Sequence, residues 1–366
     1  MKVLLLGGTG VIGTYLSNKL NEKGSQIYIS TRSPNRLSID NIHYICGNAM
    51  DMSFVQTAVE LQKWDVIVDF MTYNTKQFAE RIDLLLSHTK QYVFLSSARV
   101  YGNLEHPIKE TSPRLLDYIK DEEYLSTDEY ALTKARQENI LFSSKYSNYT
   151  IIRPCITYGP ERLQLGVLEK EEWLYRALKG RTVVLCREIM DSITTMTIGA
   201  DVCRALLSTI GNYKCLGQTY HLTSSHHRSW NQILTIYKNV FRQITGCDFK
   251  CKYVELDKFL HCRLDIQSYQ VLYDRIYNRD YDTSKESHLF DVNNCVSPEE
   301  GLTECLSSFI KDNKTFRFVN PVFEARKDKL TKEYTPLNEF RGVKNKIKYI
   351  VERFIKNQTL KNVFSS

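Results

Sequence analysis

A glycine-rich motif near the start of the chain limits the fold more than any other feature. Residues 2–6 read KVLLL, an apolar run typical of a strand, and residues 7–13 follow directly as GGTGVIG. Apolar side chains recur at helical spacing over residues 14–23, and residues 26–30 (QIYIS) read as a second strand. Strand, glycine turn, helix and strand in this order form the context in which such a motif binds a dinucleotide.

The glycines of the motif have steric roles. A side chain at Gly8 or Gly10 would keep the backbone away from a pyrophosphate, and Gly13 lets the helix pack close to the strand. Gly7, Gly10 and Gly13 also match a GxxGxxG variant. Since the start of a helix favours negative charge, we expect phosphates to bind at this turn.

Further strands and helices alternate along the chain. Apolar runs at 43–46, 66–70 and 92–95 predict strands, and the stretches 53–62 and 76–88 predict helices. The run at 66–70 (VIVDF) is nearly all apolar, as in a strand buried on both faces. The pattern predicts an α/β fold, a Rossmann-type doubly wound parallel sheet with a smaller C-terminal substrate domain.

A second group of residues points to chemistry. Ser97 follows the strand at 92–95, and Tyr130 and Lys134 are four residues apart, so they share one face of a helix. An ammonium beside a phenol favours the phenolate and lowers the phenol pKa from about 10. Such a phenol can exchange a proton with a substrate hydroxyl while a hydride is transferred at the same carbon.

Four motifs in this order resemble one known family. GGTGVIG, SSARVYG (96–102), YALTK (130–134) and IIRPCITYGP (151–160) are similar to the motifs of the NAD-dependent epimerase/dehydratase family, which are extended short-chain dehydrogenases/reductases. The resemblance covers residues 1–310, with weaker matches at 198–207 and 218–233. The best-known members of the family act on nucleotide-activated sugars.

The resemblance implies roles for individual residues. It implies that Ser97, Tyr130 and Lys134 are catalytic and that Lys134 also holds the nicotinamide ribose. The positions it implies at the cofactor are Gly7, Thr9, Gly10, Val11, Ile12 and Gly13 at the pyrophosphate, Asn48 and Ala49 near the adenine, Phe70 and Met71 beside the cofactor, and Pro154 and Cys155 near the nicotinamide, together with Tyr130 and Lys134.

Two departures from the family pattern narrow the expected reaction. Sugar 4,6-dehydratases carry Asp-Glu directly after the catalytic Ser/Thr, and Ala98-Arg99 stands there in this chain. Asp69 replaces a histidine that is common in the fourth strand. We therefore expect an epimerase or a keto-reductase of a nucleotide-activated sugar, active in polysaccharide or glycoconjugate precursor synthesis.

Arg32 bears on the choice of cofactor. NAD sites usually have an acid about twenty residues after the glycines, but Thr31-Arg32-Ser33 occupies that place. Arg32 either pairs with a 2′-phosphate or is a solvated loop residue. We expect NADP or NAD, with NADP favoured by Arg32.

The net charge of +7 is unevenly distributed. Residues 321–366 contain 11 Lys+Arg and 5 Asp+Glu, a net of +6, so residues 1–320 have a net of only +1. The main body therefore gives no support for nucleic-acid binding. A non-catalytic NAD(P)-binding or RNA-binding protein of the same fold remains the alternative.

The ten cysteines contain no CxxC pair, so we expect no metal site and free thiols in a reducing cytoplasm. The expected organisation is a nucleotide-binding domain at 1–160 with return segments at 191–223, a substrate domain at 161–190 and 224–320, and a basic tail at 321–366. The resemblance also implies a homodimer built on the 76–88 helix and the helix of Tyr130.

The tail contains a predicted basic amphipathic helix. Its apolar positions are Val343, Ile347, Ile350, Val351 and Phe354, with Lys344, Lys346, Lys348 and Arg353 among them. Such a helix packs on its own protein, docks on a partner or makes weak contact with an anionic membrane surface. The last possibility leaves open an accessory protein of a polysaccharide pathway at the membrane.

Overall fold

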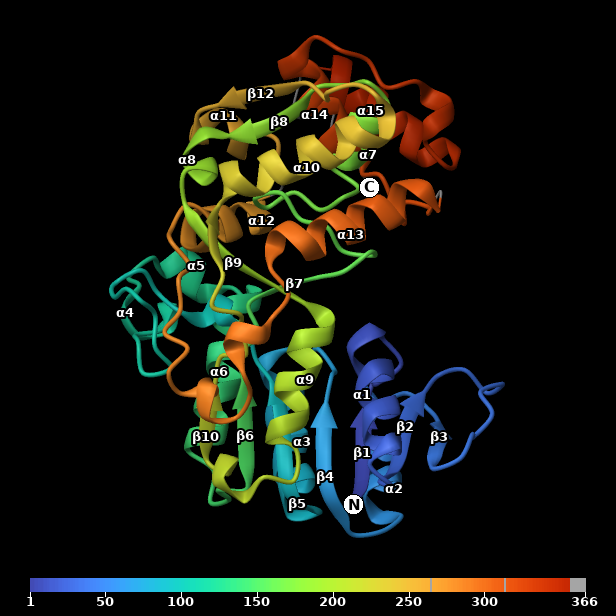
Figure 1. The fold of residues 1–366 in the computed structure, drawn as a ribbon, viewed down its shortest axis with the longest axis vertical. Coiled ribbons are helices and arrows are strands. Elements are labelled where there is room, and N and C mark those ends of the chain that lie inside the picture. Colours follow the sequence, from blue (N-terminus) through green and yellow to red (C-terminus); the bar gives the residue numbers. More distant parts are fainter. Residues whose placement is uncertain (264, 313, 356–366) are drawn as a thin grey trace. The chain divides into compact units, whose positions relative to one another are not determined.

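The computed structural model describes residues 1–263, 265–312 and 314–355, which form two units (Figure 1). Of the described residues, the first unit comprises 1–157, 195–226 and 280–296, and the second comprises those within 158–194, 227–279 and 297–355. This division differs from the expected one in two places. Residues 280–296 belong with the sheet unit, and the expected tail is part of the second unit.

Seven parallel strands form the centre of the first unit. Their order along the sheet is β10-β6-β5-β4-β1-β2-β3, and each strand runs parallel to its neighbours. This is the doubly wound order of the Rossmann fold with one added strand, so the expected fold class is confirmed. The strands are β1 (Lys2–Leu6), β2 (Gln26–Thr31), β3 (Ile42–Cys46), β4 (Trp64–Asp69), β5 (Thr89–Leu95), β6 (Tyr149–Ile152) and β10 (Gln218–Tyr220).

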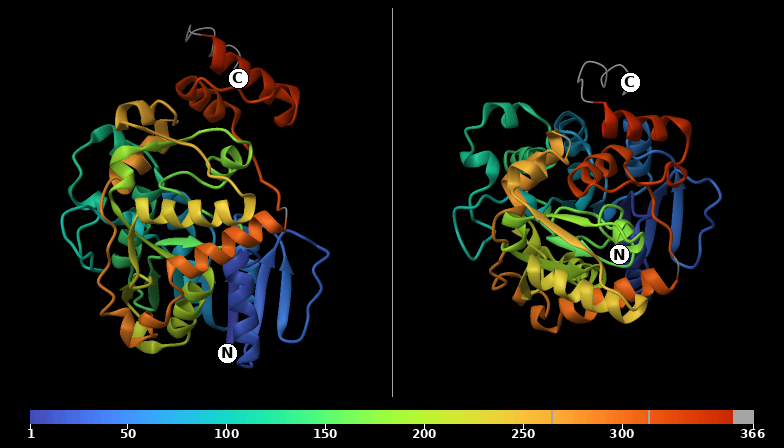
Figure 2. Two further views of the ribbon diagram at one scale, coloured as in Figure 1. Left: turned by 45° about the horizontal axis from the view of Figure 1, so that its top comes forward. Right: turned by 90° about the horizontal axis from the view of Figure 1, so that it is seen from above.

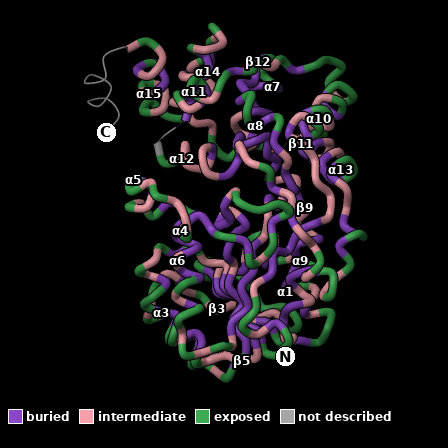
Figure 3. Tube along the Cα trace, turned by 90° about the vertical axis from the view of Figure 1, so that its left-hand side faces the viewer, coloured by how far each residue is buried: buried purple, intermediate pink, exposed green. Residues whose placement is uncertain are grey.

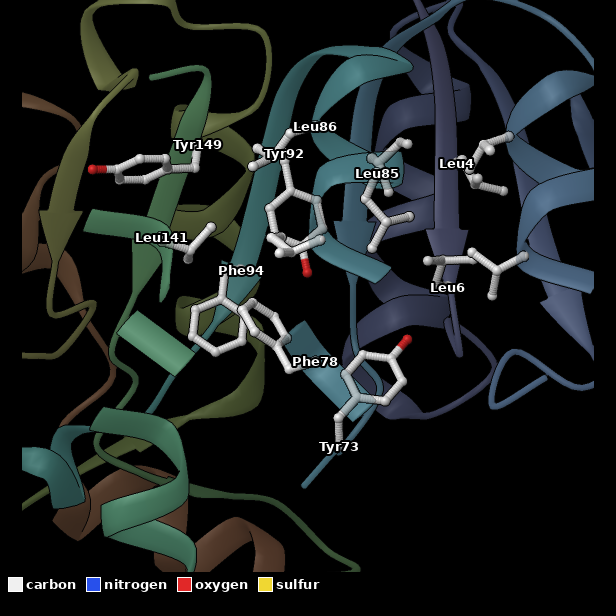
Figure 4. Close-up of a cluster of buried hydrophobic side chains, with 14 of the residues drawn as sticks. Leu4, Leu6, Tyr73, Phe78, Leu85, Leu86, Tyr92, Phe94, Leu141 and Tyr149 are labelled. Carbon is white, nitrogen blue, oxygen red and sulfur yellow. The ribbon is translucent and has the colours of Figure 1, made fainter. Parts of the chain in front are cut away.

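Both faces of this sheet are covered by helices, because successive side chains of a strand point to opposite faces. In β1, Val3 and Leu5 pack with residues of α1 and α9, whereas Leu4 and Leu6 pack with residues of α2, α3 and α6 (Figure 4). The central strands are accordingly buried (Figure 3). The helices of this unit are α1 (Val11–Glu22), α2 (Met52–Glu60), α3 (Thr75–Ser87), α4 (Leu115–Tyr118), α5 (Glu122–Ser126), α6 (Tyr130–Phe142) and α9 (Gly199–Thr209).

Two expected boundaries are corrected by the structure. Helix α1 begins at Val11 rather than at residue 14, so the last three residues of the glycine motif form its first turn. Strand β4 ends at Asp69, which leaves Phe70 outside the strand. Helix propensity does not predict that a helix begins inside the glycine motif, because glycine is a weak helix former.

The second unit contains mainly helices. Helices α10 and α13 pack together, β8 pairs with β12 in parallel, and Trp173 stacks on Tyr237 with ring centroids 4.5 Å apart. Strands β7 (Ile156–Tyr158) and β9 (Ile193–Ile198) contain the passages of the chain between the units. The remaining elements are α7 (Leu174–Leu178), β8 (Val183–Cys186), α8 (Arg187–Met190), β11 (His227–Ser229), α10 (Trp230–Thr245), β12 (Cys251–Val254), α11 (Leu256–Leu260), α12 (Asp265–Gln270), α13 (Pro298–Lys311), α14 (Pro321–Thr331) and α15 (Val343–Phe354).

A buried arginine connects α7 to the C-terminal part of the second unit. Arg176 lies on α7 with a fully buried side chain, and its guanidinium is 2.8 Å from Glu324 and 2.9 Å from both Asp328 and Glu333. Asp328 also accepts hydrogen bonds from the hydroxyls of Thr335 and Tyr349. Helices α14 and α15 lie against each other (Figure 2). The C-terminal helices are therefore an integral part of this unit.

Helix α15 forms where the tail pattern predicts it, but most of its apolar residues face solvent. Of the five predicted apolar positions, Val351 alone is buried. The other four form a stripe with 39–71% of each residue exposed: Val343, Ile347, Ile350 and Phe354. Tyr349 packs inward instead because its hydroxyl binds Asp328. No helix among the described residues is both long and apolar enough to cross a membrane.

Candidate functional site

The candidate site residues follow the carboxyl ends of the parallel strands in the first unit. Because the strands run parallel, these ends share one edge of the sheet (Figure 1), where open α/β sheets bind ligands. The structure places there the residues Gly7–Gly13 after β1, Arg32 after β2, Asn48 and Ala49 after β3, Phe70 and Met71 after β4, Ser97 after β5, and Pro154 and Cys155 after β6.

The glycine turn leaves the start of α1 uncovered. Gly7 has a positive φ of 72°, and its N–H donates to the hydroxyl of Ser30. A Cβ at Gly13 would lie 2.3 Å from the carbonyl oxygen of Gly8, so the helix touches the turn there. A Cβ at Gly10 would instead project into open space, with no atom within 4 Å. Gly10 is also the N-cap of α1 and supplies no capping side chain.

These features fit a dinucleotide pyrophosphate. The first N–H groups of a helix lack partners within the helix, and no acidic side chain lies in the first turn of α1. The space beside Gly10 would be filled by any side chain there. Met71 closes the other side of the turn, since a Cβ at Gly7 would lie 2.5 Å from its Sδ. The residues present therefore suit the group that the motif predicts.

The adenine side of the candidate site is more open. Arg32 directly follows β2 and is exposed. Asn48 is exposed, and its side chain accepts a hydrogen bond from the backbone N–H of Met50, while Ala49 is buried. Phe70 and Met71 are half-buried. An exposed guanidinium at the end of β2 is available to a ligand that reaches past the glycine turn.

Tyr130 and Lys134 lie on the first turns of α6, as their spacing predicts. The Nζ of Lys134 is 5.9 Å from the centre of the Tyr130 ring and donates a 2.7 Å hydrogen bond to the carbonyl of Leu95. Ser97 lies two residues after Leu95 in the chain and is 9% exposed. The lysine thus joins the start of α6 to the end of β5, where Ser97 begins the next segment.

Burial lowers the pKa of this lysine. Lys134 is only 3% exposed, and its burial lowers its pKa to about 8, with the charges of Asp69 and Glu138 acting in the opposite direction. At neutral pH the side chain is therefore still mostly an ammonium. That charge favours the phenolate form of Tyr130 over the phenol.

Sequence reasoning did not assign Arg99 and Glu129 to the site. The guanidinium of Arg99 lies 5.4 Å from the centre of the Tyr130 ring and 2.5 Å from a carboxylate oxygen of Glu129. Glu129 is the N-cap of α6 and accepts the N–H of Ala131. In the sequence, Arg99 stands out only because it occupies the place of an acid in the family pattern. Its position beside Tyr130, 31 residues away in the chain, has no signal in the local sequence.

Asp69 provides a buried carboxylate at the end of β4. It accepts a 2.9 Å hydrogen bond from the hydroxyl of Tyr92 and a 3.0 Å bond from the N–H of Met71. Burial raises the pKa of Asp69, and these hydrogen bonds and the charge of Lys134 act against that rise. The acid in place of the usual histidine is therefore hydrogen-bonded and interacts with the candidate catalytic lysine.

Pro154 and Cys155 contact the segment around Ser97 and two threonines. The carbonyl of Pro154 accepts the N–H of Ala98 at 3.0 Å. The Cys155 Sγ lies 3.0 Å from the hydroxyl of Thr223 and 3.3 Å from that of Thr197. Burial raises the pKa of Cys155, so this thiol is not set up as a nucleophile.

A family model agrees with this geometry. The model described as the NAD-dependent epimerase/dehydratase family matches residues 3–214, more than half of the chain. The chain belongs to this family. The match includes the glycine turn, Ser97, Tyr130 and Lys134.

The individual proteins that this chain resembles have low sequence identity to it. The chain is 25% identical over 241 residues to chloroplast stem-loop binding protein of 41 kDa b from Arabidopsis thaliana, which covers 62% of this chain and 59% of the relative. The match thus spans less than two thirds of that protein. Among solved structures, UDP-glucuronic acid 4-epimerase from Bacillus cereus, in complex with UDP-glucuronic acid and NAD, has a TM-score of 0.62 at 14% identity and covers 86% of this chain and 100% of its own.

A second solved structure gives the same result. UDP-glucose 4-epimerase from Thermotoga maritima, with UDP-glucose, has a TM-score of 0.62 at 18% identity, covering 86% of this chain and 100% of its own. At these identities the structures establish a shared fold. They do not identify the substrate of this chain.

Proposed function

We propose that the protein is an NAD(P)-dependent epimerase or keto-reductase of a nucleotide-activated sugar. The observation that carries the proposal is the placement of Tyr130 and Lys134 on the first turns of α6, with Lys134 bonded to the carboxyl end of β5 just before Ser97. Family membership supports the hydride chemistry. The UDP-sugar epimerases of the same fold support the class of substrate.

In this proposal Tyr130 moves the proton. The Tyr130 phenolate oxygen takes the proton of a sugar hydroxyl as the carbon–hydrogen bond at the same carbon breaks, and the phenol returns the proton in the reverse direction. Lys134 favours the phenolate, and Arg99 adds a second cation beside the ring. Ser97 donates a hydrogen bond to the reacting oxygen.

The cofactor would be held by the carboxyl edge of the sheet. Residues 7–13 and the start of α1 bind its pyrophosphate, Asn48 and Ala49 lie at its adenine, and Pro154 and Cys155 lie at its nicotinamide. The dinucleotide, when bound, accepts or supplies the hydride. Phe70 and Met71 pack beside it and exclude water.

The two branches of the proposal differ in where the hydride comes from. An epimerase returns the same hydride to the other face of the sugar and keeps its dinucleotide bound through turnover. A reductase takes the hydride from external NADPH. Ala98 and Arg99 in place of an acid pair argue against a 4,6-dehydratase in both cases.

The Tyr130→Phe variant tests the proposal. With UDP-glucose and UDP-glucuronic acid as first substrates, we expect turnover to fall by about 10²–10⁴-fold, because the proton has no acceptor, while dinucleotide affinity stays unchanged. The control is Tyr213→Phe, which changes a tyrosine that is 68% exposed in the same unit. Unchanged turnover in Tyr130→Phe would overturn the mechanism.

Arg32 supports a preference for NADP within this proposal. An exposed guanidinium at the end of β2 pairs with a 2′-phosphate. We expect the wild type to bind NADPH more tightly than NADH, and Arg32→Ser to lose that difference. Arg36→Ser is the matched control because Arg36 is exposed nearby and lies 5.4 Å from the Tyr44 ring. Tighter NADH binding by the wild type would assign the cofactor as NAD.

A second candidate function is binding of structured RNA without catalysis. The Arabidopsis relative, named as a stem-loop binding protein, favours it. The near-neutral charge of residues 1–320 weighs against it. Filter binding of an RNA hairpin at two salt concentrations distinguishes the candidates. If this protein binds the hairpin tightly and in a salt-sensitive way but binds no dinucleotide, RNA binding without catalysis is favoured.

Weak contact with an anionic membrane surface is a further part of the proposal. The exposed stripe of α15 (Val343, Ile347, Ile350 and Phe354) has basic residues beside it, among them Lys344, Lys346 and Arg353. We expect flotation with phosphatidylserine vesicles, and less with neutral vesicles or with an Ile347→Asn/Ile350→Asn variant. The control is Leu104→Asn, which changes an exposed leucine of the first unit. Equal flotation in all samples would remove this contact from the proposal.

The remaining parts of the proposal concern assembly and compartment. A homodimer through α3 and α6 follows from the family resemblance, and light scattering of the purified protein tests it. All ten cysteines are free thiols in the structure. This supports a reducing compartment such as the cytoplasm.

A further inference from the structure

Three ionisable side chains from distant segments meet inside the first unit. Glu110 precedes α4, His221 follows β10, and Glu286 belongs to residues 280–296, which run beside β10 in Figure 1. One ligand atom of each side chain lies within 4.8 Å of the other two. His221 and Glu286 are fully buried, and Glu110 is half-buried.

The two carboxylates are poorly satisfied where they lie. Both oxygens of Glu286 and Oε1 of Glu110 are buried and have no hydrogen-bond partner among the described residues. The Nε2 of His221 is 3.4 Å from Oε2 of Glu286. A charged carboxylate is costly to bury, so Glu286 requires either a proton or a cation beside it.

The nearest basic side chains are engaged elsewhere. The guanidinium of Arg153 makes 2.8 Å hydrogen bonds to Glu138. The ammonium of Lys285 is 2.9 Å from the carbonyl of Thr219 and 3.1 Å from the side-chain oxygen of Gln218. Neither cation is hydrogen-bonded to Glu110 or Glu286 through its carboxylate.

His221 is oriented as a ligand of a metal ion would be. Its Nδ1 is 3.1 Å from the Tyr101 hydroxyl, and its Nε2 is 2.7 Å from the backbone carbonyl of Asp282. Because a carbonyl oxygen only accepts, Nε2–H of His221 donates to Asp282 when no ion is bound, and Nδ1 accepts from the Tyr101 hydroxyl. A bound ion would replace the proton on Nε2, and Nδ1–H would then donate to the Tyr101 oxygen. Metal-binding histidines are usually held by such a second hydrogen bond.

We propose that Glu110, His221, Glu286 and the carbonyl of Asp282 bind one divalent transition-metal ion, Zn²⁺ or Mn²⁺. One imidazole nitrogen with carboxylate and carbonyl oxygens suits these ions better than Mg²⁺ or Ca²⁺, which favour oxygen ligands alone. Ligands about 2.1 Å from an ion lie at most about 4.2 Å apart. The distances from Nε2 of His221 to the Asp282 carbonyl oxygen, 2.7 Å, and to Oε2 of Glu286, 3.4 Å, are within this limit. Ligand atoms as far apart as 4.8 Å would have to approach each other by less than about 1 Å when the ion binds.

The ion would connect the segments around Glu110, His221 and Glu286, which are far apart in the sequence. It would also fix the ring of Tyr101 through His221, and Tyr101 ends the segment that begins at Ser97. The cysteine spacing predicts no metal site, and these ligands include no cysteine. Ligands at 110, 221 and 286 are too far apart in the chain to form a recognisable motif.

The test uses the full-length protein without an affinity tag. Elemental analysis of the purified protein is followed by removal of metal with a chelator and titration with ZnCl₂ or MnCl₂, read by calorimetry and by melting temperature. We expect one equivalent per chain and a melting temperature that rises with metal concentration. Glu286→Gln and Glu110→Gln should lose both effects, and Glu304→Gln, at an exposed acid of α13, should keep them.

Melting temperatures measured without metal show whether a variant fails to bind metal only because it is misfolded. Glu286→Gln removes a buried charge, so without metal it should melt no lower than the stripped wild type. If metal does not stabilise the wild type, the two carboxylates share a proton and the proposal is wrong. If both variants bind metal as the wild type does, the ion lies elsewhere and the proposal is equally wrong.

Discussion

In the first unit, β1, β4 and β5 bury apolar side chains on both faces, whereas in the second unit the buried guanidinium of Arg176 joins α7 to α14. The sheet is stabilised by many apolar contacts that are individually small and collectively large. Arg176 is surrounded by Glu324, Asp328 and Glu333, and these contacts lie inside the protein. The difference teaches that the C-terminal helices depend on a charge balance that one substitution can destroy.

The largest expected effect follows from breaking that balance. Arg176→Met leaves Asp328 buried without its cation and Glu324 with Lys327 alone, 3.6 Å away, so we expect a loss of about 3–5 kcal/mol in the free energy of unfolding. Denaturant unfolding measures it. Arg187→Met is the matched control, because Arg187 pairs with Glu255 at more than half exposure, and it should cost at most about 1 kcal/mol. Equal losses in the two variants would contradict the comparison.

A smaller effect is expected in the glycine turn of the first unit. Gly13→Ala places a methyl group 2.3 Å from the Gly8 carbonyl, so we expect a loss of about 1–3 kcal/mol together with weaker dinucleotide binding. Gly10→Ala meets no atom within 4 Å, so it should weaken binding while stability stays nearly unchanged. Melting curves and dinucleotide titration separate the two effects.

The outcome at Gly10 decides whether this turn is a binding site. Gly159→Ala, another glycine with open space around it and outside the motif, serves as the control for both readouts. If Gly10→Ala binds the dinucleotide as well as the wild type does, the phosphates do not bind at the start of α1.

The smallest expected effect concerns pH and Lys134. Its pKa of about 8 in the folded protein is below the ordinary value of 10.5, so the unfolded chain binds more protons between these two values. Stability of the wild type relative to Lys134→Met should therefore rise as pH increases from 8 to 10, by at most about 1.4 kcal/mol per pH unit. Denaturant unfolding at pH 7, 8, 9 and 10 measures the difference. A difference that falls over this range would contradict the assigned shift.

The first unit was largely predictable because its signals are local. Apolar runs and periodicity locate β1 to β5 and the helices α1, α2 and α3 between them, and the glycine motif marks the carboxyl edge of the sheet. The four-residue spacing of Tyr130 and Lys134 places both on α6. The family resemblance at 218–233 indicates the late strand β10, whereas the membership of residues 280–296 was not predicted, since it depends on contacts with distant segments.

The second unit was predicted poorly for a physical reason. The partners of Arg176 lie about 150 positions away in the chain, and nothing near Arg176 marks it as buried. The pattern of α15 identified a helix correctly, but it left open whether the apolar face packs on the protein, on a partner or on a membrane surface. Tyr349 turns inward to Asp328 instead, and the aliphatic stripe faces solvent.

The most direct test of the account is to denature the freshly purified protein and identify any dinucleotide it releases. The account predicts that the carboxyl edge of the sheet binds NAD or NADP. Release of one equivalent would indicate an epimerase that keeps its cofactor, and an empty protein that then binds NADPH more tightly than NADH would indicate a reductase. A protein that releases no dinucleotide and binds neither NAD(H) nor NADP(H) would contradict the enzyme assignment.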